Sequence, residues 1–241
     1  MAAPAPRRDA RPDAAAVIVA GGKGLRFGGR IRKQYLPLRR RPLLWWSLRA
    51  FDRSPSFGAL VLVVPADDLG KLRSSLAGWK LRKLAALVPG GSTRADSVRQ
   101  GVQAVPPGYR YIAVHDAVRP LVTVAAIEKI LVQARRHGAA IAAAPSRDTV
   151  KLADRAGFIR SSPSRETVWL AQTPQIFERK LLERAHRRKR GLAPGPVPTD
   201  DSQLVEHLRV RVKLVEPNHD NFKVTLPADL WAAHHILRRR N

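Results

Sequence analysis

The stretch that decides the fold is Val17-Ile18-Val19-Ala20-Gly21-Gly22-Lys23-Gly24-Leu25-Arg26-Phe27-Gly28. Its first four residues are apolar and three of them are β-branched, which predicts a buried strand over Val17–Ala20. The strand runs directly into a glycine-rich loop that carries cations. Glycines let backbone N–H groups approach an anion closely, and the cations balance its charge. The stretch therefore predicts a phosphate-binding loop at the end of a buried strand.

The cations of this loop continue beyond the glycines. Five of them lie within eleven residues: Lys23, Arg26, Arg30, Arg32 and Lys33. This density suits a triphosphate. The loop is not a Walker A loop, because Arg30-Ile31 follows where that loop has Lys and Ser or Thr, and Phe27 stands where a dinucleotide fingerprint needs its third glycine. A tight turn between a strand and a loop is the plainer interpretation of the glycines.

Short apolar runs and amphipathic stretches alternate along the next 120 or so residues, which is the pattern of βαβ units. Further strands are expected at Leu60–Val64, Leu84–Val88, Tyr111–Val114 and Ala139–Ala143. Helices are expected between them at Leu43–Phe51, Asp68–Leu76, Arg94–Ala104 and Val124–His137. Right-handed crossovers of this length predict an α/β fold with a doubly wound, mostly parallel, Rossmann-like sheet.

The pattern changes after Ser146. Polar alternation over Asp148–Ala153 and Phe158–Ser164, with a turn at 155–157, predicts a hairpin, so we expect residues 147–170 to form an arm that leaves the sheet. Helices at Glu178–Arg190 and Asp201–His207, a strand at Val210–Val215 and a last helix opened by Pro227 are expected to follow. We expect one domain over residues 16–241, preceded by a disordered tail over residues 1–15.

The charge of the chain calls for two interpretations. There are 44 Lys and Arg against 19 Asp and Glu, which gives a formal net charge of +25. Such a charge attracts nucleic acids and small polyanions alike. The densest cluster, Arg187–Arg190, has no aromatic residues interleaved for base stacking, which favours a solvated helix end. Nucleic-acid binding is kept as an alternative of another functional class.

Two absences narrow the classes of function. The chain has no cysteine, which excludes disulfides, thiolate nucleophiles and cysteine-bound zinc or iron–sulfur sites. No apolar run approaches the ~18 residues that a membrane-spanning helix needs, and residues 1–15 lack the apolar core of a signal peptide. We therefore expect a cytoplasmic protein without a membrane span.

A second informative stretch is Tyr111-Ile112-Ala113-Val114-His115-Asp116-Ala117-Val118-Arg119-Pro120. An apolar strand here delivers Asp116 at its carboxyl end, which is the edge where open α/β sheets bind ligands. A lone aspartate there can share Mg²⁺ with substrate phosphates, and Arg119 can meet a second anion. The plainer interpretation is that Asp116 caps a turn and pairs with Arg119, with His115 as a packed residue at the strand end.

Several further motifs carry weight only in combination. They are Lys33-Gln34-Tyr35, Gly90-Gly91-x-x-Arg94-x-x-Ser97, Arg147-Asp148-Thr149-Val150-Lys151, Thr173-Pro174-Gln175 and Asn221-x-Lys223-Val224-Thr225. With the glycine loop and the stretch around Asp116, their order and spacing resemble the 2-C-methyl-D-erythritol 4-phosphate cytidylyltransferase family of the non-mevalonate isoprenoid pathway, from Val17 to about Leu230. Two residues depart from the family pattern: Arg32 stands where proline is usual, and Gly21 where alanine is common.

The resemblance implies transfer of a cytidylyl group from CTP to methylerythritol phosphate, with release of pyrophosphate and with Mg²⁺ as cofactor. It implies catalytic roles for Arg26, Lys33 and Lys223. It implies nucleotide binding by Ala20, Gly21, Gly22, Gly24, Gly91 and Ser97, and substrate binding by Asp116, Arg119, Thr149, Arg165, Thr173 and Lys223. It also implies Mg²⁺ binding by Asp116, with Asp220 as a weaker second ligand.

The resemblance further implies a homodimer in which the arm, with Thr149 and Arg165, reaches the partner's site. A hairpin at this place can equally cover its own sheet, so the residues alone leave the dimer open. A ribitol-5-phosphate cytidylyltransferase is the alternative enzyme, because it shares the glycine loop, the stretch around Asp116 and the Thr-Pro-Gln segment. The stretches Asp148–Lys151 and Arg94–Ser97 favour the methylerythritol substrate.

Overall fold

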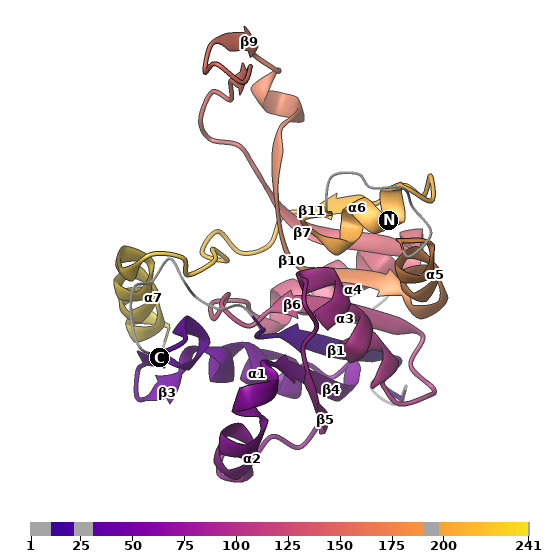
Figure 1. The fold of residues 1–241 in the computed structure, drawn as a ribbon, viewed down its shortest axis with the longest axis vertical. Coiled ribbons are helices and arrows are strands. Elements are labelled where there is room, and N and C mark those ends of the chain that lie inside the picture. The colour runs from indigo at the N-terminus through magenta and orange to yellow at the C-terminus, as the bar shows by residue number, and fades with distance from the viewer. Residues whose placement is uncertain (1–10, 22–30, 190–197, 241) are drawn as a thin grey trace.

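The computed structural model describes residues 11–21, 31–189 and 198–240, and it places a seven-stranded sheet at the centre of the molecule (Figure 1). The strands, in their order across the sheet, are β11 (Lys213–Val215), β7 (Ala139–Pro145), β10 (Trp169–Glu178), β6 (Tyr111–Asp116), β1 (Ala14–Val19), β4 (Phe57–Val64) and β5 (Leu84–Pro89). All neighbours are parallel except β10, which runs antiparallel to both β6 and β7. The expected α/β fold with a mostly parallel sheet is confirmed.

Helices cover both faces of this sheet. One face carries α1 (Leu43–Arg53), α2 (Leu69–Ala77) and α4 (Val124–His137), and the other carries α3 (Arg94–Gln103), α5 (Arg179–Lys189) and α6 (Asp201–Glu206). Strand β1 shows why both faces need cover: Ala16 and Ile18 pack into the first core, and Ala15 and Val17 into the second. Successive side chains of a strand point to opposite faces, so a run of apolar residues is buried on both sides.

Local signals in the sequence fix the ends of two helices that lie next to the site. Helix α3 begins after Thr93, whose side chain accepts a hydrogen bond from the Asp96 N–H, and α4 begins after Thr123, which caps it in the same way. Helix α4 ends at Gly138, which has a φ of 78°, a conformation that glycine adopts without steric cost.

The amino-terminal boundary differs from the expectation. Strand β1 begins at Ala14, and Ala14 and Ala15 are fully buried, so the last residues of the expected tail belong to the sheet. The Asp13 backbone carbonyl also accepts hydrogen bonds from the N–H groups of Arg110 and Tyr111. Small alanines ahead of the β-branched run gave no periodic signal, which explains why the strand start was placed too late. Residues 1–10 lie outside the described ranges.

The antiparallel strand β10 was not expected from the sequence. Its middle, around Pro174, is polar and contains a residue without an N–H donor, a pattern that argues against a central strand. The sheet accommodates this because the pairing with β7 shifts register between Ala171 and Gln175. The strand at 210–215 is also shorter than expected, since only Lys213–Val215 pairs.

The arm leaves the sheet after β7 and returns through β10 (Figure 1). Its tip is a small hairpin of β8 (Leu152–Ala153) and β9 (Ile159–Ser161), followed by the 3-10 helix η4 (Arg165–Thr167). The expected turn is present, with Gly157 at a φ of 90°. Figure 1 shows the tip projecting well beyond the sheet and its helices, so in this structure the hairpin does not fold back to cover its own sheet.

A third core joins the carboxyl-terminal helix α7 (Pro227–Arg239) to the hairpin of β2 (Pro37–Leu38) and β3 (Arg41–Pro42). Leu38, Val118, Val224 and Leu237 are buried in it. This packing brings the segment just before α7 against the turn after β6. None of the helices in the described ranges is long and apolar enough to cross a membrane.

The turn of the β2–β3 hairpin is strained. Its two residues, Arg39 and Arg40, have φ values of 49° and 62°, a left-handed conformation that costs roughly 1 kcal/mol or more for a residue with a Cβ. Arg39 is tied down, because its guanidinium donates to the Leu237 carbonyl. Arg40 is exposed.

We expect Arg40→Gly to stabilise the protein by about 0.5–1 kcal/mol, because glycine adopts this conformation without strain. Arg40→Ala is the matched control, since it removes the same side chain but keeps the Cβ. Thermal unfolding of both variants measures the effect. An equal rise in Tm for the two would show that charge, rather than backbone strain, is responsible.

Candidate active site

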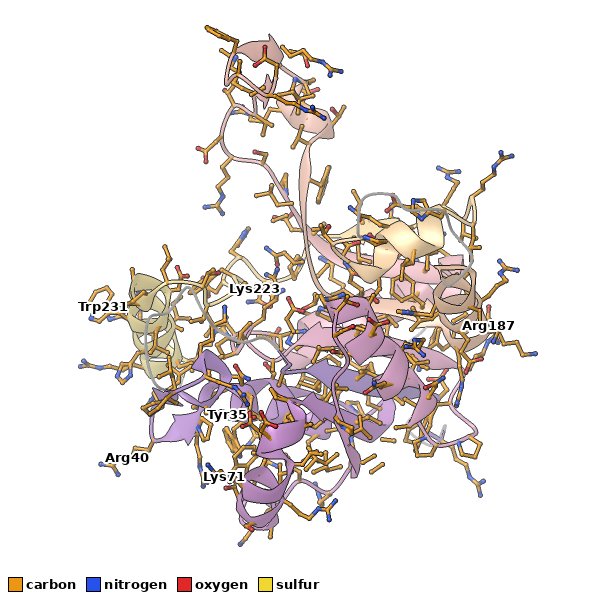
Figure 2. All side chains as sticks on the ribbon, viewed as in Figure 1. Tyr35, Arg40, Lys71, Arg187, Lys223 and Trp231 are labelled. Carbon is orange, nitrogen blue, oxygen red and sulfur yellow. The ribbon has the colours of Figure 1, made fainter. Side chains whose placement is uncertain are left out.

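Asp116 ends β6 at the carboxyl edge of the sheet, and three cations surround its carboxylate. Its Oδ2 lies 2.9 Å from Lys223 Nζ and 3.9 Å from Arg119 Nε, and its Oδ1 lies 3.4 Å from a guanidinium nitrogen of Arg94. The cations come from three different places: the segment before α7, the turn after β6 and the first residue of α3. In the view of Figure 2, Lys223 lies between α7 and the foot of the arm.

The charges of this cluster are strongly coupled. Burial acts to raise the pKa of Asp116, but the three cations outweigh it and hold that pKa well below its usual range. Burial likewise acts to lower the pKa of Arg94, and its two carboxylate partners, Asp201 and Asp116, raise it above its ordinary value. Asp116 therefore carries its negative charge throughout the physiological pH range, and the cluster has a net positive charge.

Arg94 links this cluster to a second buried carboxylate. Its guanidinium donates to Asp201 Oδ2 at 2.7 Å, and Asp201 Oδ1 lies 3.2 Å from His186 Nε2. Gln175 of β10 holds the start of α6 in place, because its Oε1 accepts hydrogen bonds from the N–H groups of Asp201 and Ser202. The middle of β10 therefore orients Asp201, and Asp201 orients Arg94.

The side chains of Asn221 and Arg119 hold the segment that carries Lys223 in place. Buried Asn221 donates to Gln172 Oε1 and to the Thr173 carbonyl, each at 2.9 Å, and its own carbonyl accepts from Arg119 at 2.9 Å. Thr173 Oγ1 in turn accepts from the Asp116 N–H at 3.0 Å. The motifs around Asp116, Thr173 and Lys223 are far apart in the sequence and form one structure in space.

The segment that carries Lys33 is anchored beneath β1. Gln34 is buried and donates to the Ala20 carbonyl at 2.7 Å, which fixes the 3-10 helix η2 (Lys33–Tyr35) at the end of the strand. Arg32, where the family pattern has proline, forms an ion pair with Asp68, and the Tyr35 hydroxyl donates to the same carboxylate at 2.8 Å. The departure at position 32 thus adds an anchor for this segment.

The loops after β1 and β5 meet at Ser97. Its Oγ accepts from the Gly91 N–H at 3.0 Å and donates to the Thr93 carbonyl at 3.0 Å. A Cβ placed on Gly91 would lie 2.4 Å from the Asp96 Cβ, so only glycine fits there, whereas a Cβ on Gly21 would lie 3.5 Å from Ser97 Oγ, an ordinary contact. At Gly21 and Gly91 these loops form a wall of backbone groups around Ser97, beside the carboxyl ends of β1 and β5.

The comparisons with known proteins agree with this geometry. The family model of 2-C-methyl-D-erythritol 4-phosphate cytidylyltransferase matches residues 14–239. The chain belongs to this family. A relative of that name from Desulforamulus reducens is 41% identical over 227 residues, which are 94% of this chain and 96% of the relative.

Solved structures lead to the same family. The 4-diphosphocytidyl-2C-methyl-D-erythritol synthase of Anaerococcus prevotii superposes with a TM-score of 0.82 at 30% identity, over 94% of this chain and 96% of that one. The cytidylyltransferase of Thermus thermophilus gives a TM-score of 0.72 at 31% identity, over 92% and 98% of the two chains. The fold and its family are therefore established along nearly the whole chain.

The structure of this chain brings together only part of the site that the sequence predicts. Asp116, Arg119, Thr173 and Lys223 form one cluster, and Ala20, Gly21, Gly91 and Ser97 line the neighbouring loops. Thr149 and Arg165 are exposed on the arm. Asp220 pairs with Arg240 at 3.1 Å. Gly22, Gly24 and Arg26 lie outside the described residues.

Sequence reasoning assigned no role to Arg94, Asp201 or Asn221, although each orients a residue of the cluster. Arg94 offered a signal, because it follows a Gly-Gly loop at the expected start of a helix. Asn221 stands in the motif that ends at Thr225, but nothing near it in the sequence indicates its partner, and Asp201 gives no signal beyond that of an ordinary helix start. Their partners, Arg94 for Asp201 and Arg119 for Asn221, lie 107 and 102 residues away in the sequence.

The described residues provide few ligands for Mg²⁺. No group of three or more His, Asp or Glu side chains that could hold a metal is present in the described ranges. Asp116 provides one carboxylate, and Asp220 is in its own ion pair. Mg²⁺ prefers six oxygen ligands and commonly takes several from phosphates and water. The residues thus fit a cation that arrives with a nucleotide and meets one carboxylate.

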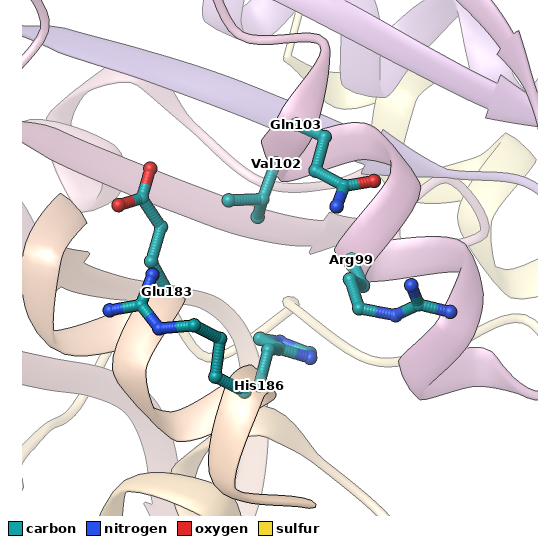
Figure 3. A pocket seen from close by; sticks show the side chains of 6 residues that line it. Arg99, Val102, Gln103, Glu183 and His186 are labelled. Carbon is teal, nitrogen blue, oxygen red and sulfur yellow. The ribbon is translucent and has the colours of Figure 1, made fainter. Parts of the chain in front are cut away.

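The structure also contains a cavity outside the Asp116 cluster. It has a volume of about 310 Å³ and opens between α3 and α5 (Figure 3). The residues that line it are Arg99, Val102, Gln103, Glu183, His186 and Arg187. Of the basic cluster at 187–190, only the Arg187 side chain is described. This cavity shares no residue with the Asp116 cluster.

We expect Gly91→Ala to raise the KM for the nucleotide at least ~10-fold, because the added Cβ displaces the loop that Ser97 holds and even 1 Å of misplacement is costly. Gly21→Ala is the matched control: it adds the same methyl group on the facing loop, where it fits. Steady-state kinetics with varied CTP compare the two. Equal KM values would contradict the proposed wall.

The free energy of unfolding at acidic pH should show that the fold holds His115 neutral. Burial lowers the pKa of His115 to about 3, whereas in the unfolded chain it titrates near 6.5. Between these values the unfolded state binds the extra proton, so the free energy of unfolding falls as the pH falls, by up to about 1.4 kcal/mol per pH unit. Below about pH 4, Asp116 and Asp201 add to the loss, because their lowered pKa values favour folding only while they are ionised.

Urea unfolding of the parent and of His115→Asn at pH 7, 6 and 5 measures this dependence. We expect a shallower fall in the variant, because the other six histidines are common to both proteins. Parallel pH profiles would show that His115 is not held neutral by the fold.

Proposed function

We propose that the Asp116 cluster and the adjacent loops transfer a cytidylyl group from CTP to 2-C-methyl-D-erythritol 4-phosphate, forming 4-diphosphocytidyl-2-C-methyl-D-erythritol and pyrophosphate in isoprenoid biosynthesis. Membership of the family supports the activity. The observation that carries the assignment to this site is the Asp116 carboxylate held among Lys223, Arg119 and Arg94 at the carboxyl edge of the sheet.

The geometry suits a reaction between two phosphates. The nucleophile is an oxygen of the alcohol phosphate, which is already anionic, so no strong general base is required. Catalysis then depends on aligning the attacking oxygen with the α-phosphorus and on neutralising the charge of the transition state. A partly buried site with an excess of cations supplies the second requirement.

The residues divide this work. The loops at Ala20–Gly21 and Gly91 bind the nucleotide through backbone groups, with Ser97 holding Gly91 in place. By family resemblance, Gly22, Gly24 and Arg26 complete this loop, and Arg26 and Lys33 stabilise the α-phosphorus and the leaving pyrophosphate. Lys223 and Arg119 bind the alcohol phosphate beside Asp116, and Thr173 holds the Asp116 backbone.

Mg²⁺ is part of the proposal. When bound, it shields the charges of the triphosphate and so lets the attacking phosphate approach. Asp116 is the residue that would meet it, since Asp220 pairs with Arg240. The ionised state of Asp116, which its three cationic neighbours maintain, provides the oxygen ligand that such a cation prefers.

A homodimer is also proposed, with the arm as the contact between subunits. The arm exposes Phe158 and Ile159 by 72% and 67%, an unusual position for such residues in a monomer. Thr149 and Arg165 belong to the same arm, whose tip projects away from the sheet (Figure 1). In a two-fold dimer each arm would bring them to the site of the partner.

A cytoplasmic location completes the proposal, and the absence of cysteine is consistent with a reducing compartment. A nucleic-acid partner is favoured by the net charge of +25 alone, which a polyanionic nucleotide substrate explains equally well. To identify the alcohol substrate, purified enzyme is incubated with CTP and either methylerythritol phosphate or ribitol 5-phosphate. The release of pyrophosphate is then compared between the two. We expect release only with the methylerythritol substrate; a preference for ribitol 5-phosphate would replace the assigned alcohol.

A further inference from the structure

His115 is a buried polar residue that the proposed chemistry does not use. It precedes Asp116 at the end of β6, and its ring packs against Phe51 with 5.3 Å between the ring centroids. Both ring nitrogens reach the site: Nδ1 lies 3.1 Å from Thr173 Oγ1, and Nε2 lies 3.3 Å from the Arg119 carbonyl oxygen. A buried imidazole needs a partner for each ring nitrogen, and here both partners belong to residues of the site.

The partners determine which nitrogen carries the proton. The Arg119 carbonyl can only accept, so Nε2 must donate to it. Nδ1 of the neutral ring then accepts from the Thr173 hydroxyl, and the oxygen of that hydroxyl accepts from the Asp116 N–H. Every donor in this series of hydrogen bonds has one acceptor. The series runs from the backbone N–H of Asp116 to the backbone carbonyl of Arg119.

We propose that His115 is a positioning residue for cytidylyl transfer, which holds Asp116 through Thr173 and holds Arg119 directly. The inference rests on the proposed function. Together with the hydrogen bond from the Arg119 N–H to the Asp116 carbonyl at 3.0 Å, the two contacts of the ring fix the turn that presents both side chains. The ring thereby sets the spacing between the carboxylate and the guanidinium that meet the substrates.

The two contacts do not have equal support. The Arg119 carbonyl is also within reach of a second donor, Ser47 Oγ of α1 at 3.2 Å, which shares its one proton with the Ala117 carbonyl at 3.1 Å. Among the described residues, the Thr173 hydroxyl has one acceptor for its proton, His115 Nδ1. The branch from Nδ1 through Thr173 to Asp116 is therefore the one that depends most on His115.

Three variants of His115 separate positioning from packing. His115→Leu removes both contacts, His115→Asn retains an acceptor near the Nδ1 position, and His115→Gln retains a donor near the Nε2 position. We expect His115→Leu to lower kcat about 10- to 100-fold and to raise the KM for the alcohol phosphate, with the KM for CTP unchanged. His115→Asn should recover more of kcat than His115→Gln.

Phe51→Leu is the matched control, because it loosens the same core without touching a hydrogen bond. It should lower the Tm and leave kcat unchanged. If His115→Leu retains the kcat of the parent and its KM for the alcohol phosphate, the residue is packing alone and the proposal is overturned. The same holds if His115→Asn recovers no more activity than His115→Leu.

The tautomer gives a readout that does not depend on activity. Long-range ¹H–¹⁵N correlation of the wild-type enzyme, with the His115 signals assigned by their loss in His115→Asn, should show a protonated Nε2 and a bare Nδ1. A protonated Nδ1 with a bare Nε2 would overturn the proposal. If wild-type enzyme transfers no cytidylyl group to any polyol phosphate, the proposed function fails instead, while the tautomer result still stands.

Discussion

Replacing Asp116 by asparagine is expected to lower kcat/KM about 10³-fold, a loss typical of removing one preorganised electrostatic contact. The amide keeps the shape of the side chain but leaves Arg94, Lys223 and Arg119 without the carboxylate that orients them. If Asp116 also meets Mg²⁺, the variant should need more of the cation for half-maximal activity. Pyrophosphate release at a series of Mg²⁺ concentrations measures both effects.

Asp220→Asn is the matched control for this variant. It makes the same chemical change at the other aspartate that the resemblance offered as a ligand, and it breaks only the exposed pair with Arg240. We expect near-parental kinetics. A comparable loss in both variants would show that Asp220 contributes as much to activity as Asp116. If Asp116→Asn responds to Mg²⁺ as the parent does, Asp116 orients the neighbouring Lys and Arg side chains and does not bind Mg²⁺.

Two inactive chains are expected to restore activity when they form a heterodimer. Asp116→Asn damages the body of the site, and Arg165→Ala damages the arm, so each homodimer alone should be nearly inactive. If the arm serves the partner, one site of the heterodimer combines both lesions and the other combines two intact contributions. The purified heterodimer should then show up to about half the activity of the parent dimer, because of its two-fold symmetry.

Different affinity tags on the two chains allow the heterodimer to be isolated after co-expression. Its activity is compared with that of each mutant homodimer carrying the same tags. A confirmed heterodimer as inactive as the homodimers would show that Arg165 acts within its own chain. A parent protein that remains monomeric at assay concentrations would contradict the dimer itself.

The strands and helices of the βαβ units could be predicted from the sequence because their signals are local. The run at residues 17–20, for example, is continuous and apolar by itself. The alternation of such runs with amphipathic stretches predicts a parallel sheet. Strand β10 could not be predicted, because Pro174 and its polar neighbours break the pattern that marks a central strand. Only pairing with two distant strands, with a register shift on one side, makes this segment a strand.

The residues of the candidate site were likewise only partly predictable from the sequence. The glycine loops and Asp116 follow from their positions at the ends of predicted strands, and Lys223 and Thr173 entered only through the family resemblance. The contact of Arg94 with Asp201 and that of Asn221 with Arg119 depend on tertiary packing, which no local pattern encodes. The effect of Arg32, which departs from the family pattern, also could not be predicted, because its partner Asp68 is brought to it only by the fold.

The most direct test of the central claim follows the phosphorus atoms of CTP. Purified enzyme is incubated with methylerythritol phosphate, Mg²⁺ and CTP that is labelled in either the α- or the γ-phosphate. We predict that the α-label appears in the cytidine diphosphate ester of the alcohol and the γ-label in pyrophosphate, and that neither moves without the alcohol phosphate. Label released as CMP, or γ-label found on the alcohol, would contradict cytidylyl transfer at this site.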